Sequence, residues 1–146
     1  MIDHVERVAA GVPPRARGLA YLHDVLEQVD GADDELRKLG LSDDELSILG
    51  LLTRSPDEPY SAYVSRIARS NGRVGRIARV IKMADLDDHL RQRPVRPGAP
   101  DYAWAQEQII ASQRAHGEAP PAGRAQREIR RADVQAATEG RLRRTG

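Results

Sequence analysis

The stretch from Gly18 to Asp30, GLAYLHDVLEQVD, constrains the fold more strongly than any other part of the sequence. Its large apolar residues recur at three- and four-residue spacing: Leu19, Leu22, Leu26 and Val29. This spacing is typical of a helix with one face in a core, and we predict a helix from about Pro14 to Val29. The pair His23-Asp24 interrupts the stripe, and Glu27 follows His23 by four residues, which places both side chains on one face of a continuous helix.

The same periodicity recurs along the chain, and no stretch alternates in the manner of a β-strand. Helices are predicted over residues 2–11, 14–29, 32–39, 43–54, 59–70, 73–91 and 100–116. Glycine and proline signals separate them, and Ser42 with Glu45 forms a capping-box pattern. The chain has no Phe, one Trp and four Tyr, so its core must be aliphatic and rich in alanine, which favours helices. The predicted fold class is therefore all-α, as a compact helical bundle.

The 146 residues suffice for one domain, and their charge is unevenly divided. Residues 1–116 hold 16 basic and 18 acidic residues, whereas residues 117–146 hold 7 arginines and 4 acids. The second segment has few large apolar residues, so we expect a disordered or loosely helical, flexible tail after a domain spanning 1–116. A tail of this kind either keeps the protein soluble or contacts nucleic acid, and the lack of aromatic residues for base stacking favours the first interpretation.

The chain contains no cysteine, which excludes disulfides, thiolate catalysis and cysteine-based zinc sites. No apolar run approaches the ~18 residues of a membrane span, and the first residues lack the apolar segment of a signal peptide. We therefore expect a soluble, cytoplasmic protein that does not interact with a membrane.

Four polar residues interrupt core stripes: His4, His23, Asp24 and Asp85. Two imidazoles and two carboxylates form a suitable set of ligands for a divalent metal such as Mn²⁺, Fe²⁺, Zn²⁺ or Mg²⁺. Each residue also has an ordinary interpretation, as a structural histidine or a solvated aspartate. Asp85 continues the apolar stripe of Ile77 and Ile81, which argues against solvation. From the residues alone, a metal site and a purely structural role are about equally supported.

The order of these residues resembles the HD superfamily of metal-dependent phosphohydrolases. More narrowly, it is similar to the RelA/SpoT-type domain that hydrolyses guanosine tetraphosphate, and to its small single-domain relatives. The resemblance spans about residues 2–92 and is carried by four blocks in order: IDHVERVA, AYLHDVLE, GLLTRSPDEPYSAYVSRIA and VIKMADLDDHL. It implies an HD-domain-like helical bundle.

The resemblance also implies roles for individual residues. His4, His23, Asp24 and Asp85 match the four ligands of the family's metal, most often Mn²⁺, and Glu27 matches an acid that helps to activate the attacking water. For Glu27, a surface position or a role in orienting an imidazole is the alternative. Lys82 and His89 occupy positions near the substrate, and Lys82 would contact phosphate or pair with a carboxylate. The implied reaction is hydrolysis of a nucleotide phosphate or pyrophosphate.

The chain differs from the family pattern at three places. Gln28 stands where the hydrolases carry a second carboxylate, and His89 stands where they carry an asparagine. The chain also starts at the block that contains His4, so we expect the helix that precedes it in the family to be absent. Two alternatives to an enzyme therefore stay open: an HD-like module that binds metal or nucleotide without turnover, and a helical interaction protein.

Two further patterns have alternative interpretations. Six basic residues follow one another without an intervening acid: Arg66, Arg69, Arg73, Arg76, Arg79 and Lys82. They would form either an electrostatic funnel for a phosphorylated substrate or a solvated face, and their three-residue spacing favours a solvated face. Thr53, Arg54, Tyr60 and Tyr63 would form part of a pocket wall, although tyrosines at helical spacing more often belong to a core.

Overall fold

The computed structural model describes residues 2–92 and 96–118. Within these ranges every regular element is a helix, which confirms the predicted all-α class. The elements are α1 (Ile2–Ala10), the short 3₁₀ helix η1 (Pro14–Ala16), α2 (Arg17–Leu22), α3 (Val25–Gln28), α4 (Ala32–Lys38), α5 (Asp43–Leu52), α6 (Tyr60–Arg69), α7 (Gly72–Arg91) and α8 (Tyr102–Ala115). The flexible tail predicted for 117–146 lies, apart from residues 117 and 118, outside the described part of the chain.

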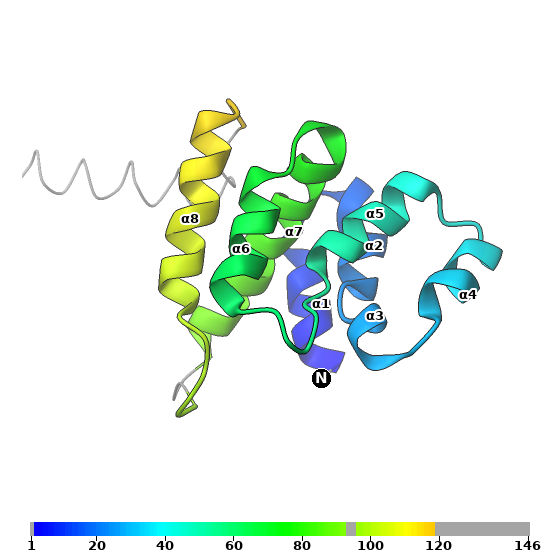
Figure 1. The fold of residues 1–146 in the computed structure, drawn as a ribbon, viewed down its shortest axis with the longest axis horizontal. Coiled ribbons are helices and arrows are strands. Elements are labelled where there is room, and N and C mark those ends of the chain that lie inside the picture. The colour runs from blue at the N-terminus through cyan, green and yellow to red at the C-terminus, as the bar shows by residue number, and fades with distance from the viewer. Residues whose placement is uncertain (1, 93–95, 119–146) are drawn as a thin grey trace, which may run out of the picture.

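Helix α7 is the central element of the bundle. It packs against α1, α5, α6 and α8, and these neighbours surround it along most of its length (Figure 1). Helices α2, α3 and α4 lie on the side of α1 and α5, away from α8. The core is one aliphatic cluster that includes Val8, Leu49, Ile67, Ile81, Leu86 and Ile109. The predicted aliphatic core is therefore present. Helix α7 contributes residues both to this core and to the buried polar group described below.

Local sequence signals explain where the helices begin. Ser42 caps α5 with the predicted capping box, because its hydroxyl accepts from the Glu45 amide and the Glu45 carboxylate accepts from the Ser42 amide. Asp101 caps α8 by accepting a hydrogen bond from the backbone N–H of Trp104. Gly72 opens α7 with a φ of 68°, a conformation that glycine adopts without steric cost.

The single helix predicted from Pro14 to Val29 is wrong as a continuous element. The structure divides it into η1, α2 and α3, and a turn at His23 and Asp24 separates α2 from α3. The His23 ring donates to the carbonyl of Ala20, and the amide of Glu27 bonds to the carbonyl of Asp24, three residues back. These short-range bonds replace regular helical pairing at the His-Asp pair, so its two side chains are presented from a turn.

A buried ion pair attaches the end of α8 to the α6–α7 corner. Arg79 has no exposed surface and forms a two-pronged pair with the carboxylate of Glu118. Its remaining nitrogen donates to the carbonyls of Ile67, at 3.2 Å, and Ser70, at 2.5 Å. The arginine thus joins the α6–α7 corner to the end of α8, 39 residues further along the chain.

No helix in the described ranges is both long and apolar enough to cross a lipid bilayer.

Candidate metal centre and its pocket

Asp85, on α7, is the point on which the polar residues of the core converge. Its Oδ1 lies 3.2 Å from Nε2 of His4, 3.8 Å from Nε2 of His23 and 3.1 Å from Nε2 of His89. Its Oδ2 accepts a hydrogen bond of 2.7 Å from Lys82. Burial opposes ionisation of Asp85, but Lys82 and the three imidazoles outweigh it and hold the pKa of Asp85 well below its usual range.

Helix α1 contributes His4, whose ring is fixed at both nitrogens. Its Nδ1 donates to Oδ2 of Asp88 at 2.7 Å, which leaves Nε2 directed at Asp85. Asp88 is in turn paired with Arg7. The hydrogen bond with Asp85 raises the pKa of His4 to about 9, against the effect of burial and with the help of Asp88. A histidine whose Nδ1 is held by a carboxylate is the usual arrangement of a metal-binding imidazole.

The turn between α2 and α3 contributes His23, whose Nε2 is buried and makes no hydrogen bond within the described residues. Its Nδ1 lies 2.6 Å from the carbonyl of Ala20, so Nδ1 carries the proton that this bond requires. Burial lowers the pKa of His23, but Asp85 and Asp24 outweigh burial and raise it above the ordinary value. His4, His23 and Asp85 each offer one ligand atom, and these atoms all lie within 4.8 Å of one another.

Asp24 and Glu27, the other two predicted acids of this region, lie beside this group rather than within it. Oδ1 of Asp24 is 3.2 Å from Nε2 of His23, and its side chain is partly exposed. Oε1 of Glu27 accepts a hydrogen bond of 2.7 Å from the backbone N–H of Arg54. The structure therefore brings His4, His23 and Asp85 together, with Asp24 adjacent to His23 and with Glu27 at the wall of the same pocket.

Lys82 is buried beneath the pocket, one turn before Asp85. Its ammonium lies over the ring of Tyr63, 4.9 Å from the ring centroid, in addition to its bond with Asp85. Burial opposes the charged form, but Asp85 outweighs it and keeps the pKa of Lys82 above its usual value. Of the two roles predicted for Lys82, the structure shows the pairing with a carboxylate.

His89 lies one turn after Asp85, and its ring is stacked on Tyr102 of α8. The ring centroids are 4.4 Å apart and the planes differ by 7°. This stack attaches the start of α8 to the wall of the pocket, and it fixes the His89 nitrogen that contacts Asp85.

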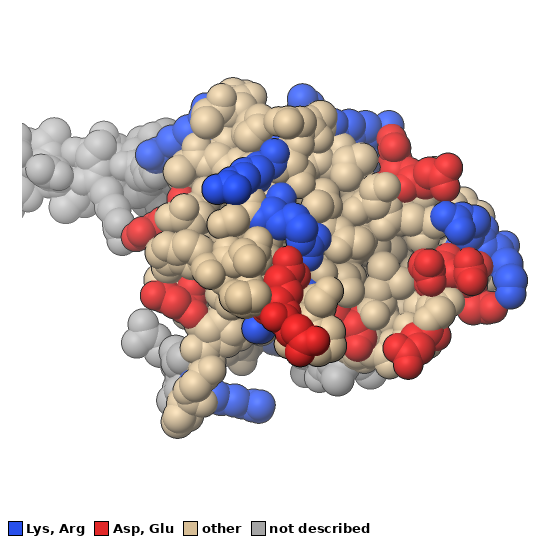
Figure 2. Space-filling model, viewed as in Figure 1, with Lys and Arg blue, Asp and Glu red and all other residues tan. Residues whose placement is uncertain are grey.

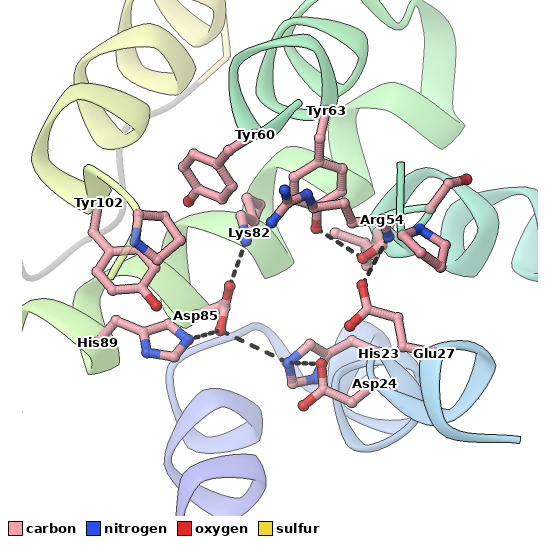
Figure 3. A pocket seen from close by; sticks show the side chains of 14 residues that line it. His23, Asp24, Glu27, Arg54, Tyr60, Tyr63, Lys82, Asp85, His89 and Tyr102 are labelled. Atoms are coloured by element: carbon pink, nitrogen blue, oxygen red, sulfur yellow. Dashed lines mark hydrogen bonds and ion pairs between the residues drawn. The ribbon is translucent and has the colours of Figure 1, made fainter. Parts of the chain in front are cut away.

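These residues line a pocket with a volume of about 320 Å³, whose arrangement Figure 3 shows. His89 and Tyr102 lie on one side, Arg54 and Glu27 on the opposite side, and Asp85 and Lys82 between them. Tyr60 and Tyr63 form a further wall, at which the Arg54 guanidinium lies 5.7 Å from the ring centroid of Tyr60. The tyrosines assigned to the core on their spacing thus also face this pocket, although Tyr63 is buried.

The basic run of residues 66–82 is neither a funnel nor a uniformly solvated face. Arg66 pairs with Glu58 at a partly exposed position, whereas Arg79 with Glu118 and Lys82 with Asp85 form buried pairs, so half of the run is paired with acids. On the face shown in Figure 2, positive and negative side chains are interspersed and form no single basic patch.

The sequence prediction gave the supporting residues Asp88 and Tyr102 no role in the site. Asp88 follows Asp85 by three residues and continues the same stripe, which indicated a polar region of the helix but not a partner for His4. The position of Tyr102 had no such signal, because α8 reaches the pocket only through tertiary packing.

Comparisons with protein-family models and with curated proteins give no match to this chain.

Proposed function

We propose that the protein is a metal-dependent phosphohydrolase of the HD type that acts on a phosphate or pyrophosphate group of a nucleotide. The single observation that carries this proposal is the grouping of His4, His23 and Asp85, in which the buried Nε2 of His23 makes no hydrogen bond to any described residue. A buried nitrogen lone pair beside an imidazole and a carboxylate is the environment that a divalent cation satisfies.

The residues present fit such a cation. Donor atoms that share one ion at about 2.0–2.2 Å lie no more than about 4.4 Å apart, so separations within 4.8 Å need only small side-chain shifts. In the metal-free protein, Asp85 raises the pKa of both imidazoles, that of His4 to about 9. A dication bound beside Asp85 would take the place of this stabilising positive charge. His4, His23 and Asp85 would hold the ion, with Asp24 as the fourth ligand, and the resemblance favours Mn²⁺ among mixed nitrogen and oxygen sites.

A bound divalent cation supplies a more acidic water molecule and neutralises negative charge on the phosphoryl group. Proton transfer and the positioning of the ligands depend on the side chains of the protein. Glu27 is held by the Arg54 amide through Oε1, while its Oε2 makes no hydrogen bond to any described residue and accepts the proton of the attacking water. Lys82 and His89 hold the two oxygens of Asp85 and act as positioning residues.

The pocket is of a suitable size and chemistry for a nucleotide. Its volume of about 320 Å³ lies at the lower end of the range for small-molecule sites. It combines aromatic rings, from Tyr60 and Tyr102, with the cation Arg54 and the acids at the metal centre. Aromatic rings beside cationic groups suit a base and its phosphates.

The test is a hydrolysis panel of nucleotides with protein that has been stripped of metal and reloaded with Mn²⁺. We expect phosphate or pyrophosphate release that EDTA abolishes, and a loss of at least about 100-fold in His23→Asn and Asp85→Asn. Full activity in either variant would contradict this mechanism. Metal binding by calorimetry together with no turnover on the whole panel would favour the non-catalytic binding module.

A further inference from the structure

Arg54, on the segment between α5 and α6, is placed in the pocket without an anionic partner. The two non-imidazole cations that line the pocket are Arg54 and Lys82, and Lys82 is neutralised by Asp85. Within the described residues, no carboxylate lies within ion-pair distance of the Arg54 guanidinium. Its Nε donates to the carbonyl of Glu58, and no described residue accepts a hydrogen bond from the two terminal nitrogens.

The segment that carries Arg54 is held rigidly by Arg66. One terminal nitrogen of Arg66 donates to the carbonyl of Thr53 at 2.9 Å, and the guanidinium also grips the carboxylate of Glu58. Together with the bond from the Arg54 amide to Glu27, these contacts fix the backbone on both sides of Arg54. A guanidinium held in place before binding loses little conformational entropy when it binds a ligand.

A second unused donor belongs to the aromatic side chain next to the guanidinium, and it points toward Tyr102 (Figure 3). The hydroxyl of Tyr60 is buried and makes no hydrogen bond to any described residue, and the Arg54 guanidinium lies near the ring of the same tyrosine. Burial raises the pKa of Tyr60 to about 12, against the influence of Lys82, so the hydroxyl stays protonated. Arg54 and Tyr60 therefore offer several hydrogen-bond donors and one positive charge that no described residue satisfies.

We propose that Arg54 and Tyr60 form a subsite for a second phosphoryl group, distinct from the one that is hydrolysed at the metal centre. Arg54 and the acids of the metal centre line the same pocket from different sides, so that a ligand in the pocket faces both (Figure 3). The subsite selects substrates with at least two phosphoryl groups over monophosphates, because the planar guanidinium of an arginine can donate two parallel N–H bonds to the oxygens of one phosphate. This inference rests on the proposed function for the identity of the cleaved group, whereas anion binding at Arg54 does not require turnover.

The test measures binding of two probes by calorimetry: adenosine 5′-(α,β-methylene)diphosphate, which resists hydrolysis between its phosphorus atoms, and adenosine 5′-monophosphate. Each is titrated into the full-length protein with Mn²⁺ and, separately, in EDTA. With Mn²⁺ we expect the wild type to favour the diphosphate analogue. Arg54→Ala should lower the affinity for the analogue by about tenfold or more and the affinity for the monophosphate by less than about threefold. This is the effect expected when charge-assisted hydrogen bonds to one phosphate are lost.

Matched variants separate this role from folding and from bulk charge. Arg54→Lys keeps the charge without the paired N–H donors of the guanidinium, so it should lose part of the affinity for the diphosphate analogue. Tyr60→Phe should lose a smaller part of that affinity. Arg69→Ala, which removes an exposed arginine at the end of α6, should change affinity less than about twofold. Thermal unfolding of each variant shows whether the segment around Arg54 has remained intact.

The subsite would be overturned if Arg54→Ala and Arg54→Lys bound the analogue with an affinity within about twofold of wild type, or if Arg69→Ala lost as much affinity as Arg54→Ala. Failure of the wild type to bind the analogue in either state would overturn it as well. If the Mn²⁺-loaded wild type hydrolyses no nucleotide while Arg54→Ala still shows the selective loss, the proposed function fails and the subsite stands.

Discussion

The Nδ1 of His4 donates a hydrogen bond of 2.7 Å to Asp88, and this bond orients the opposite nitrogen of the ring toward Asp85. The two residues are 84 positions apart in the sequence, and the packing of α1 against α7 brings them together. Arg7, one turn after His4, grips the same carboxylate and fixes it. The orientation of the proposed ligand His4 is thus set by a residue that does not itself belong to the group of three.

Asp88→Asn should weaken Mn²⁺ binding by about 10- to 100-fold, because the ring of His4 loses the acceptor that orients it and increases its basicity. Isothermal titration calorimetry measures the change. Asp44→Asn is the matched control, since Asp44 is exposed on α5, and it should leave metal affinity unchanged. Equal metal affinity in Asp88→Asn and wild type would show that Asp88 does not support the metal centre.

The stability of the metal-free protein should depend on pH through His4. Contact with Asp85 raises the pKa of His4 from 6.5 to about 9, so the folded state holds this proton more tightly than the unfolded chain. The stabilisation is fully present below pH 6.5 and is lost as the pH rises through about 9. Urea unfolding in EDTA at pH 6 and pH 9.5 should show this loss in wild type and a smaller loss in His4→Gln. Identical pH dependence in the two proteins would contradict the assignment.

The buried pair of Arg79 and Glu118 should be sensitive to removal of one partner. Glu118→Gln leaves the guanidinium of Arg79 buried without its counter-ion and should lower the free energy of unfolding by about 3–5 kcal/mol. Glu35→Gln breaks the exposed pair with Lys38, whose side chains are 70% and 72% exposed, and should cost less than about 1 kcal/mol. Urea titration compares the two variants. Similar losses would mean that Arg79 finds other compensation among its carbonyl partners.

Two glycines in helices should respond in opposite directions to alanine. A Cβ at Gly75 would lie 2.1 Å from the carbonyl oxygen of Ser70, so Gly75→Ala must displace the α6–α7 corner and should cost about 1–3 kcal/mol or more. A Cβ at Gly50, within α5, would have no atom within 4 Å outside its own turn of chain. Gly50→Ala should therefore stabilise the protein by about 0.5–1 kcal/mol. Thermal melts of the two variants test the pair, and a stabilised Gly75→Ala would show that the close approach to Ser70 is readily relieved.

Helical periodicity carried most of the fold prediction. The spacing of Leu46, Leu49 and Leu52 indicated α5, and the break at Asn71-Gly72 indicated the start of α7, because these signals act within one or two turns. The continuous helix through His23 was wrong for the same reason. The spacing of apolar residues indicates a helix, but it gives no information about the hydrogen bond from the His23 ring to the carbonyl of Ala20, which accompanies the break in the helix.

For the candidate site, the order of His4, His23 and Asp85 in the sequence led to a metal-site prediction, and the structure brings these three side chains together. The metal, the reaction and the substrate stay predictions. Arg54 and Tyr60 carried too little signal in the sequence to be assigned to the site. Their importance depends on which of their donors are left without acceptors, and that depends on every neighbour in three dimensions.

By itself, the sequence determined the helical class, the aliphatic core and the polar residues that interrupt it, because amphipathic spacing and residue chemistry are local properties of a chain. Only the tertiary structure decided that Asp85 faces three imidazoles, that Asp88 holds His4 and that Lys82 is neutralised while Arg54 is not. Those relationships depend on the packing of α1, α5, α6 and α8 around α7, and interactions between residues so distant in the sequence are set by the shape of the whole core.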